Sequence, residues 1–408
     1  MLAAMSMTRL LPAAVLLCCV ATTHAQSRAE AWDANTPEVE CRNYTLKTDL
    51  PESQARIVAD NLDQLHDTCV KFFNELKGDV PYGDQVCVFN DRDDYMAWLK
   101  KYINVDGTGS AGMFVRSGSR RAIVAWKGNM RLSDLLGTLR HEGFHHFAAV
   151  LFEDIPVWAN EGIAEVFERA VPVSNGLAVG NVRSSDVLRL QQLVEQNALL
   201  PLNQFFRLSP TSWNHQVNRG SASNNYLQAW AVVQFLLYGD EGQYKNGFLG
   251  FLRAMNQGRS WQQAFQDAYG VRNYALLQKH FLKWVKELRP SDLERVVPRM
   301  ILMGEGLAAL GEKGEGFTNA GVVANRLKSA GFSCTVPEQF GGGQFSTSDN
   351  DPFDLGNASG GQLQLCDQRG KVLRQATRRP CVIAKGLAPR ELMLRWKTDG
   401  TWELLVDD

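Results

Sequence analysis

The stretch LRHEGFHHFAAVLFEDIPVWANEGIAEVFE, Leu139–Glu168, carries two clusters of histidine and glutamate side chains close together in the chain. The first cluster is HEGFHH at residues 141–146, and the second is WANEGIAE at residues 158–165. The segment EDIP, Glu153–Pro156, separates them. Because proline cannot continue a helix, we expect a first helix to end there and a second helix to run back beside it. The sequence therefore predicts two packed helices that bring both clusters together.

The first cluster has the spacing HExxH. We expect residues 133–151 to form a helix with Ser133 as its N-cap. His141 and His145 then lie one turn apart on one face, so two imidazoles can reach one metal ion. Glu142 is adjacent but rotated, and its carboxylate can lie beside the ion, where it can take a proton from water.

The second cluster offers the third ligand that a catalytic zinc site requires, since one helical turn presents only two. Glu161 is the candidate, and fifteen residues separate it from His145. Glu165, one turn further along, is well placed to accept the distal imidazole N–H of a ligating histidine. His146 points about 100° away from its neighbour on an ideal helix, so we expect it behind the site or at the surface. Zinc is the expected cofactor.

HEGFH followed by NEGIAE resembles the gluzincin metallopeptidases, whose active helix bears HExxH and whose next helix bears a glutamate ligand. WANEGIAE is also similar to the W-x-N-E-G-x-A pattern of the aminopeptidases of that clan and to the smaller peptidase MA-like domains. The spacing is shorter than in those aminopeptidases and there is no GAMEN-type stretch, which favours the MA-like group. The resemblance covers about residues 110–240.

The resemblance implies further roles for residues outside the two clusters. Thermolysin-like enzymes place an acidic residue four positions after the glutamate ligand, which matches Glu165. Gluzincins use a tyrosine or histidine from a downstream helix to stabilise the oxyanion, and Tyr226 is the first candidate, with His215 the second. They also pair an extended substrate with an edge strand, which implies that Gly112–Val115 or Ala122–Trp126 lines the cleft.

The composition excludes some classes of partner and indicates an ordinary globular protein. The chain has 408 residues, of which 45% are hydrophobic and 21% charged. Lys and Arg total 43 against 44 Asp and Glu, so no strong positive field attracts nucleic acid. We expect a peptide or protein substrate and no nucleic acid partner.

The first 25 residues have the pattern of a secretory signal. Arg9 supplies a positive charge, and Leu10–Val20 is an apolar run followed by small residues. This run is too short for a membrane helix of about 20 residues. We therefore expect a secreted or periplasmic chain that starts near Gln26 and has no transmembrane segment. Leucines rather than a small residue precede Cys18, so a lipid anchor is not expected.

Six cysteines remain after removal of the signal. In an oxidising compartment they can form up to three disulfides, and the alternative is that some are buried free thiols. They are Cys41, Cys69, Cys87, Cys334, Cys366 and Cys381.

The pattern of apolar residues predicts an α+β fold in several parts. A helix is expected over residues 52–77, a strand over 85–90, and a hairpin of two strands at residues 111–115 and 121–126. Helical spacing dominates from Leu135 to Pro290. Strands are expected near the C-terminus at residues 362–366, 371–375, 391–396 and 401–406. The expected parts are a signal peptide (1–25), an N-terminal α/β part with the hairpin (26–130), a helical catalytic region (131–290) and a small β-rich domain (300–408).

Together these features predict a zincin-like catalytic domain with a mainly helical C-terminal lobe, followed by the small β-rich domain. The predicted function is hydrolysis of peptide bonds by metal-activated water, with Glu142 as general base. The alternative is a catalytically silent metal-binding scaffold or protein-binding module on the same fold.

Overall fold

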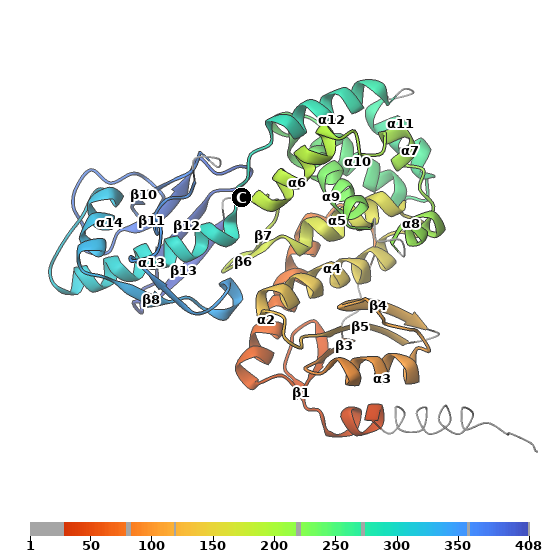
Figure 1. Cartoon of the computed structure of the whole chain (residues 1–408), viewed down its shortest axis with the longest axis horizontal. Coiled ribbons are helices and arrows are strands. Elements are labelled where there is room, and N and C mark those ends of the chain that lie inside the picture. The colour runs from red at the N-terminus through yellow and green to blue at the C-terminus, as the bar shows by residue number, and fades with distance from the viewer. Residues whose placement is uncertain are drawn as a thin grey trace, which may run out of the picture.

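The computed structural model describes residues 28–78, 83–117, 120–217, 222–270, 274–356 and 360–406, without the side chains of residues 117, 120, 214–217 and 222. The predicted signal peptide, residues 1–25, lies outside the described residues. The fold is a mixture of helices and small sheets, so the predicted α+β class is confirmed. In Figure 1 the long helix α4 (Leu132–Leu151) crosses the middle of the molecule, with a sheet below it, helices above it and the C-terminal region to one side.

The N-terminal sheet has five strands in the order β1-β2-β3-β5-β4. Strands β2, β3 and β5 are parallel, whereas β4 pairs with β5 in the antiparallel sense and forms an edge. The predicted hairpin is therefore confirmed as β4 and β5. The strands are β1 (Glu38–Val39), β2 (Tyr44–Thr48), β3 (Asp84–Phe89), β4 (Gly112–Ser117) and β5 (Arg120–Trp126).

Helices cover both faces of this sheet. Alternate residues of a strand point to opposite faces, and β5 shows the consequence. Ile123 is buried with Leu62 and Leu139, from α2 (Glu52–Phe72) and α4, on one face. Val124 is buried with Trp98, from α3 (Arg92–Tyr102), on the other face. The apolar contacts on the first face thus hold α4 against the sheet.

The helical region after α4 is packed around α9, most of whose side chains are buried. Helix α5 approaches α9 very closely at Gly162, where an added Cβ would lie 2.5 Å from the carbonyl oxygen of Ala229. A side chain of any other residue would push the two helices apart. The helices are α5 (Val157–Glu168), α6 (Ser184–Glu195), α7 (Leu202–Phe205), α8 (Pro210–Val217), α9 (Ala222–Tyr238), α10 (Lys245–Asn256), α11 (Trp261–Tyr269) and α12 (Ala275–Glu287), with a 3-10 turn η1 (Gly239–Gly242).

The C-terminal region combines a four-stranded antiparallel sheet with two helices that the sequence pattern had not indicated. The predicted strand at residues 371–375 is wrong: the Asp367 carboxylate accepts the N–H groups of Arg369 and Lys371 and holds a turn, and Val372 is 58% exposed. The elements are α13 (Leu293–Glu312), α14 (Ala320–Ser329), β8 (Ser333–Thr335), η2 (Glu338–Phe340), β9 (Gln344–Ser346), β10 (Gln362–Cys366), β11 (Cys381–Lys385), β12 (Leu392–Trp396) and β13 (Trp402–Val406).

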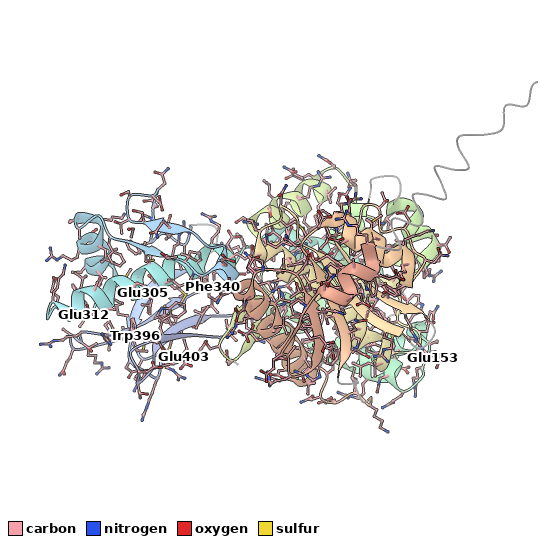
Figure 2. All side chains as sticks on the ribbon, turned by 90° about the horizontal axis from the view of Figure 1, so that it is seen from below. Glu153, Glu305, Glu312, Phe340, Trp396 and Glu403 are labelled. Carbon is pink, nitrogen blue, oxygen red and sulfur yellow. The ribbon has the colours of Figure 1, made fainter. Side chains whose placement is uncertain are left out.

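Two of the segments that join the C-terminal region to the rest lie close to α4 and α5. The hairpin of β6 (Val171–Val173) and β7 (Gly176–Ala178) follows directly on α5, and its apolar side chains belong to the C-terminal core. Ser174 in its turn donates its N–H to the Leu404 carbonyl of β13 at 2.6 Å. The second segment is η2, which packs against α4. Its Phe340 lies where the C-terminal region meets the rest of the molecule (Figure 2).

No disulfide joins the six cysteines of the described residues in this structure. Cys366 and Cys381 lie directly opposite each other on β10 and β11, and both are buried. The pairing of cysteines into disulfides stays a prediction.

Within the described residues, no helix combines the length and the apolar character that a membrane crossing requires.

Candidate metal centre

The two helices expected from the sequence are α4 and α5, and they turn where Glu153–Pro156 separates them. Pro156 is the N-cap of α5, a position at which the missing N–H of proline costs nothing. The predicted cap of α4 is wrong, because the helix begins at Leu132 with Arg131 as its N-cap, and Ser133 lies in the first turn.

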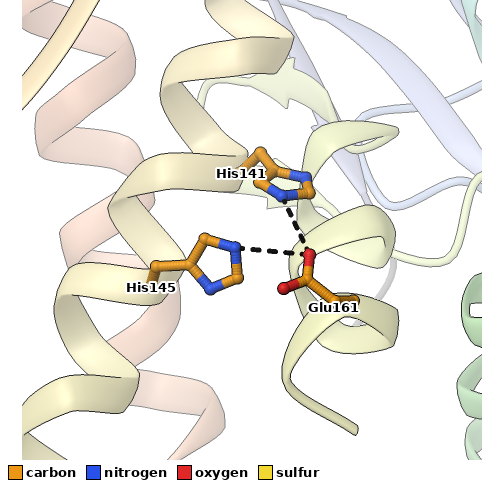
Figure 3. A group of neighbouring side chains, drawn as sticks. All are labelled: His141, His145 and Glu161. Atoms are coloured by element: carbon orange, nitrogen blue, oxygen red, sulfur yellow. Dashed lines mark ion pairs between the residues drawn. The ribbon is translucent and has the colours of Figure 1, made fainter. Parts of the chain in front are cut away.

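The structure brings His141, His145 and Glu161 together. One oxygen of Glu161, Oε2, lies 3.5 Å from His141 Nε2 and 3.6 Å from His145 Nε2 (Figure 3). The three ligand atoms lie within 4.8 Å of one another. Atoms bound at 2.0–2.1 Å to one tetrahedral ion are roughly 3.3 Å apart, so these residues fit a zinc ion with only small movements.

The electrostatics of the group favour a cation between the three side chains. Burial raises the pKa of Glu161, but hydrogen bonds with His141 and His145 outweigh it and lower this pKa to about 2. Burial likewise opposes a charge on His141, but hydrogen bonds with Glu161 and Glu168 raise its pKa well above the ordinary value. The carboxylates thus favour a positive charge at the imidazoles. A metal cation would supply this charge in place of a proton.

Hydrogen bonds orient both imidazoles with Nε2 toward Glu161. Asn160 Oδ1 lies 3.3 Å from Nδ1 of His145. Glu168 Oε2 lies 3.0 Å from Nδ1 of His141. Such contacts fix the tautomer and the ring orientation of a metal ligand.

The sequence had assigned the orienting role to Glu165, and the structure gives the closer contact to Glu168. Glu165 Oε1 is 3.7 Å from His141 Nδ1, and its other oxygen accepts a hydrogen bond from Arg169, one turn further on. Arg169 is also held by Asp186 at 2.7 Å. This buried ion pair turns the Glu165 carboxylate away from the imidazole and leaves the position to Glu168.

Glu142 lies next to the edge strand of the sheet. Its Oε2 accepts the backbone N–H of Phe114 in β4 at 2.7 Å. Because this N–H points away from β5, Glu142 lies at the outer edge of β4. Of the two strands that the resemblance offered as lining the cleft, β4 is thus adjacent to Glu142, while β5 lies inside the sheet between β3 and β4.

Tyr226, on α9, lies near the group but does not join it. Its ring centroid is 6.3 Å from that of His141 and 5.3 Å from that of Trp213. Burial, together with the negative charge of Glu161, raises the pKa of Tyr226 to about 12, so its hydroxyl keeps its proton and can donate a hydrogen bond. His215, the second candidate, belongs to α8, but its side chain lies outside the described residues.

His146 faces away from the group and is fully buried, so it is not a surface residue. Its Nε2 lies 2.6 Å from Asp84 Oδ2, and Arg121 forms an ion pair with the same carboxylate at 2.9 Å. These contacts tie α4 to β3 and β5 under the site.

Two residues of the centre were missed by the sequence interpretation. Glu168 follows Glu161 by seven residues, two helical turns, and this spacing could have placed it on the same face. Asn160 carries no comparable signal, because its role depends on the angle at which α5 crosses α4.

The residues of this centre lie in the part of the chain that is similar to other proteins. Comparison with curated proteins gives no match. Residues 135–271, which include both clusters and Tyr226, match the model of a family described as "Protein of unknown function (DUF1570)".

Proposed function

We propose that this protein is a zinc-dependent metallopeptidase of gluzincin type that hydrolyses peptide bonds. The observation that carries the proposal is the convergence of His141, His145 and Glu161 on one point, with Glu142 next to His141 in the sequence and its carboxylate held at an edge strand. This combination supplies three ligands and a separate general base, which are the protein groups required for metal-assisted hydrolysis.

The side chains divide the chemistry between them. When bound, zinc supplies Lewis acidity that polarises a carbonyl oxygen and acidifies water. Glu142 takes the proton from the attacking water on its carboxylate and passes it to the nitrogen of the leaving amine. Oε2 already accepts the N–H of Phe114, which leaves Oε1 as the freer oxygen for the proton. The Tyr226 hydroxyl, which stays protonated at neutral pH, donates a hydrogen bond to the developing oxyanion.

The edge strand β4 favours an extended peptide as the substrate. An unpaired strand edge presents backbone N–H and C=O groups with which an extended chain can pair. Phe114 already donates its N–H to Glu142, and Gly112 accepts a hydrogen bond from the Ser110 hydroxyl. The substrate therefore pairs with the remaining outward groups, beginning with the Phe114 carbonyl.

The test of the metal site is zinc content. His141→Ala and Glu161→Ala each remove one of three ligands, so each variant should lose most of its zinc after dialysis. Full zinc stoichiometry in both folded variants would overturn the assignment of the ligands.

The test of the mechanism is Glu142→Gln, with Glu153→Gln as the matched control on the exposed turn between α4 and α5. The glutamine keeps the acceptor for Phe114 but cannot take a proton. We expect normal zinc content and a loss of peptide cleavage of about a hundred- to ten-thousandfold, with the control unchanged. Undiminished turnover in Glu142→Gln would contradict the mechanism. A wild-type protein that binds zinc but cleaves nothing in a broad peptide library would favour the silent scaffold instead.

A further inference from the structure

A polar cavity of about 330 Å³ lies where the catalytic region meets the C-terminal region. Its walls come from the N-terminal half of α4, strand β6, the first turn of α6, the N-terminal part of α13, and η2. None of the residues to which we assign peptide hydrolysis lines it. The cavity is therefore separate from the proposed site of hydrolysis.

Three arginines line this cavity against two carboxylates. Arg131 pairs with Asp134 at 2.7 Å, and Arg183 pairs with Glu294 at 2.7 Å. The third, Arg140, has no carboxylate of the described residues within ion-pair distance. The lining therefore carries one positive charge in excess.

Arg140 is the unusual member, because it is buried with neutral acceptors only. Its side chain is 4% exposed, and it donates to the carbonyl oxygens of Phe167 and Glu168 and to Oδ1 of Asn61 at 2.8–3.1 Å. A guanidinium has five N–H groups, so these three bonds leave two. A buried cation with no carboxylate in ion-pair contact is costly, and an anion in the cavity would lower that cost.

One helix N-terminus adds to the positive potential. Helix α4 begins at Leu132, and its N-cap Arg131 makes no side-chain cap hydrogen bond, whereas the Ser184 N–H at the start of α6 is already accepted by Asp292 Oδ1 at 2.7 Å. First-turn residues of both helices, Ser133 and Ser185, line the cavity. The N-terminal ends of helices attract anions through these N–H groups and through the helix dipole.

We propose that this cavity is a binding site for the oxyanion group, carboxylate or phosphate, of a small ligand. The anionic group is held by Arg140 and Arg183 with the help of the N-terminal end of α4. The apolar side chains of Val171, Val297 and Phe340 take up the carbon part of the ligand. Because Phe340 comes from η2, the bound ligand connects the C-terminal region to α4 and stabilises their contact (Figure 2).

The test uses the full-length protein after removal of metal by a chelator and dialysis into a buffer without phosphate or carboxylates. Metal removal prevents the probes from binding at the metal centre. Isothermal titration calorimetry is carried out at constant ionic strength with inorganic phosphate in one arm and propionate in the other. We expect saturable binding of at least one probe, with a rise in the melting temperature on the order of several degrees at saturation.

The location of binding is tested with Arg183→Gln and Arg131→Gln, which are at the rim and leave the buried core intact. Arg326→Gln is the matched control, an ion-paired arginine on α14 outside the cavity. Arg183→Gln should weaken binding about tenfold or more, Arg131→Gln should weaken it less, and the control should bind like the wild type. Arg140→Gln should abolish binding where circular dichroism shows that it folds.

Each outcome bears on the proposal. Binding of phosphate alone identifies a phosphate-type ligand, and binding of propionate alone identifies a carboxylate. The proposal is overturned if neither probe binds saturably to the wild type up to about 10 mM, a concentration at which charge-assisted sites are normally occupied. It is also overturned if the three arginine variants of the cavity bind as tightly as Arg326→Gln.

Discussion

Removal of the Glu168 carboxylate should weaken zinc binding although Glu168 is not a ligand. In Glu168→Ala, Nδ1 of His141 loses an acceptor at 3.0 Å, and the nearest alternative, Glu165, is 3.7 Å away and engaged with Arg169. The imidazole is then free to rotate, and its Nε2 is a weaker donor of electron density to a metal.

The expected loss of zinc affinity follows from the loss of this one contact between Glu168 and His141. Loss of a partner that orients a ligating histidine lowers metal affinity by about 10- to 100-fold, which corresponds to about 1.4–2.8 kcal/mol. Glu168→Gln should fall between the wild type and Glu168→Ala, because an amide oxygen still accepts the N–H but carries no charge. Glu165→Gln is the matched control. It changes a carboxylate four residues after the ligand Glu161, and this carboxylate lies farther from His141 than that of Glu168 does.

The assay is competition for zinc between each variant and a chromophoric chelator at fixed pH, with folding checked by circular dichroism. We expect the order wild type, Glu165→Gln, Glu168→Gln and Glu168→Ala from tight to weak. A larger loss of affinity in Glu165→Gln than in Glu168→Ala would refute the reasoning and return the orienting role to Glu165.

Three further predictions concern single residues. Tyr226→Phe should keep full zinc content, which metal analysis measures, and should lower peptide turnover by less than Glu142→Gln, because only a hydrogen bond to the oxyanion is lost. Gly162→Ala should destabilise folding by roughly 1–3 kcal/mol in chemical denaturation, since its Cβ would meet the Ala229 carbonyl at 2.5 Å; Gly250→Ala, in open space on α10, should not destabilise it. Burial lowers the pKa of His66 in the folded protein below its value in the unfolded chain, which is about 6.5. As the pH falls below that value, the unfolded chain binds a proton more readily than the folded protein, so the folded state loses stability. His66→Gln, which cannot titrate, should show a smaller fall in unfolding free energy between about pH 7.5 and pH 5.5 than the wild type, and an equal fall would contradict this.

The sequence by itself determined the features of the site that depend on spacing along one helix. His141 and His145 are four residues apart, so they share a face on any regular α-helix, and Glu142 is necessarily rotated away from them. The proline at position 156 marked the break between the two helices for an equally local reason. Such relations need no knowledge of what packs against the helix.

Only the tertiary structure decided the relations between elements. The choice of Glu168 over Glu165 depends on Arg169, whose buried ion pair draws Glu165 aside. The distance from Glu161 to both imidazoles depends on how α5 packs against α4. The arginine-lined cavity joins residues more than 100 positions apart in the chain, such as Arg140 and Phe340. Periodicity fixes the direction of a side chain on its own helix, but the position of one helix against another is set by the packing of side chains, which no local pattern contains.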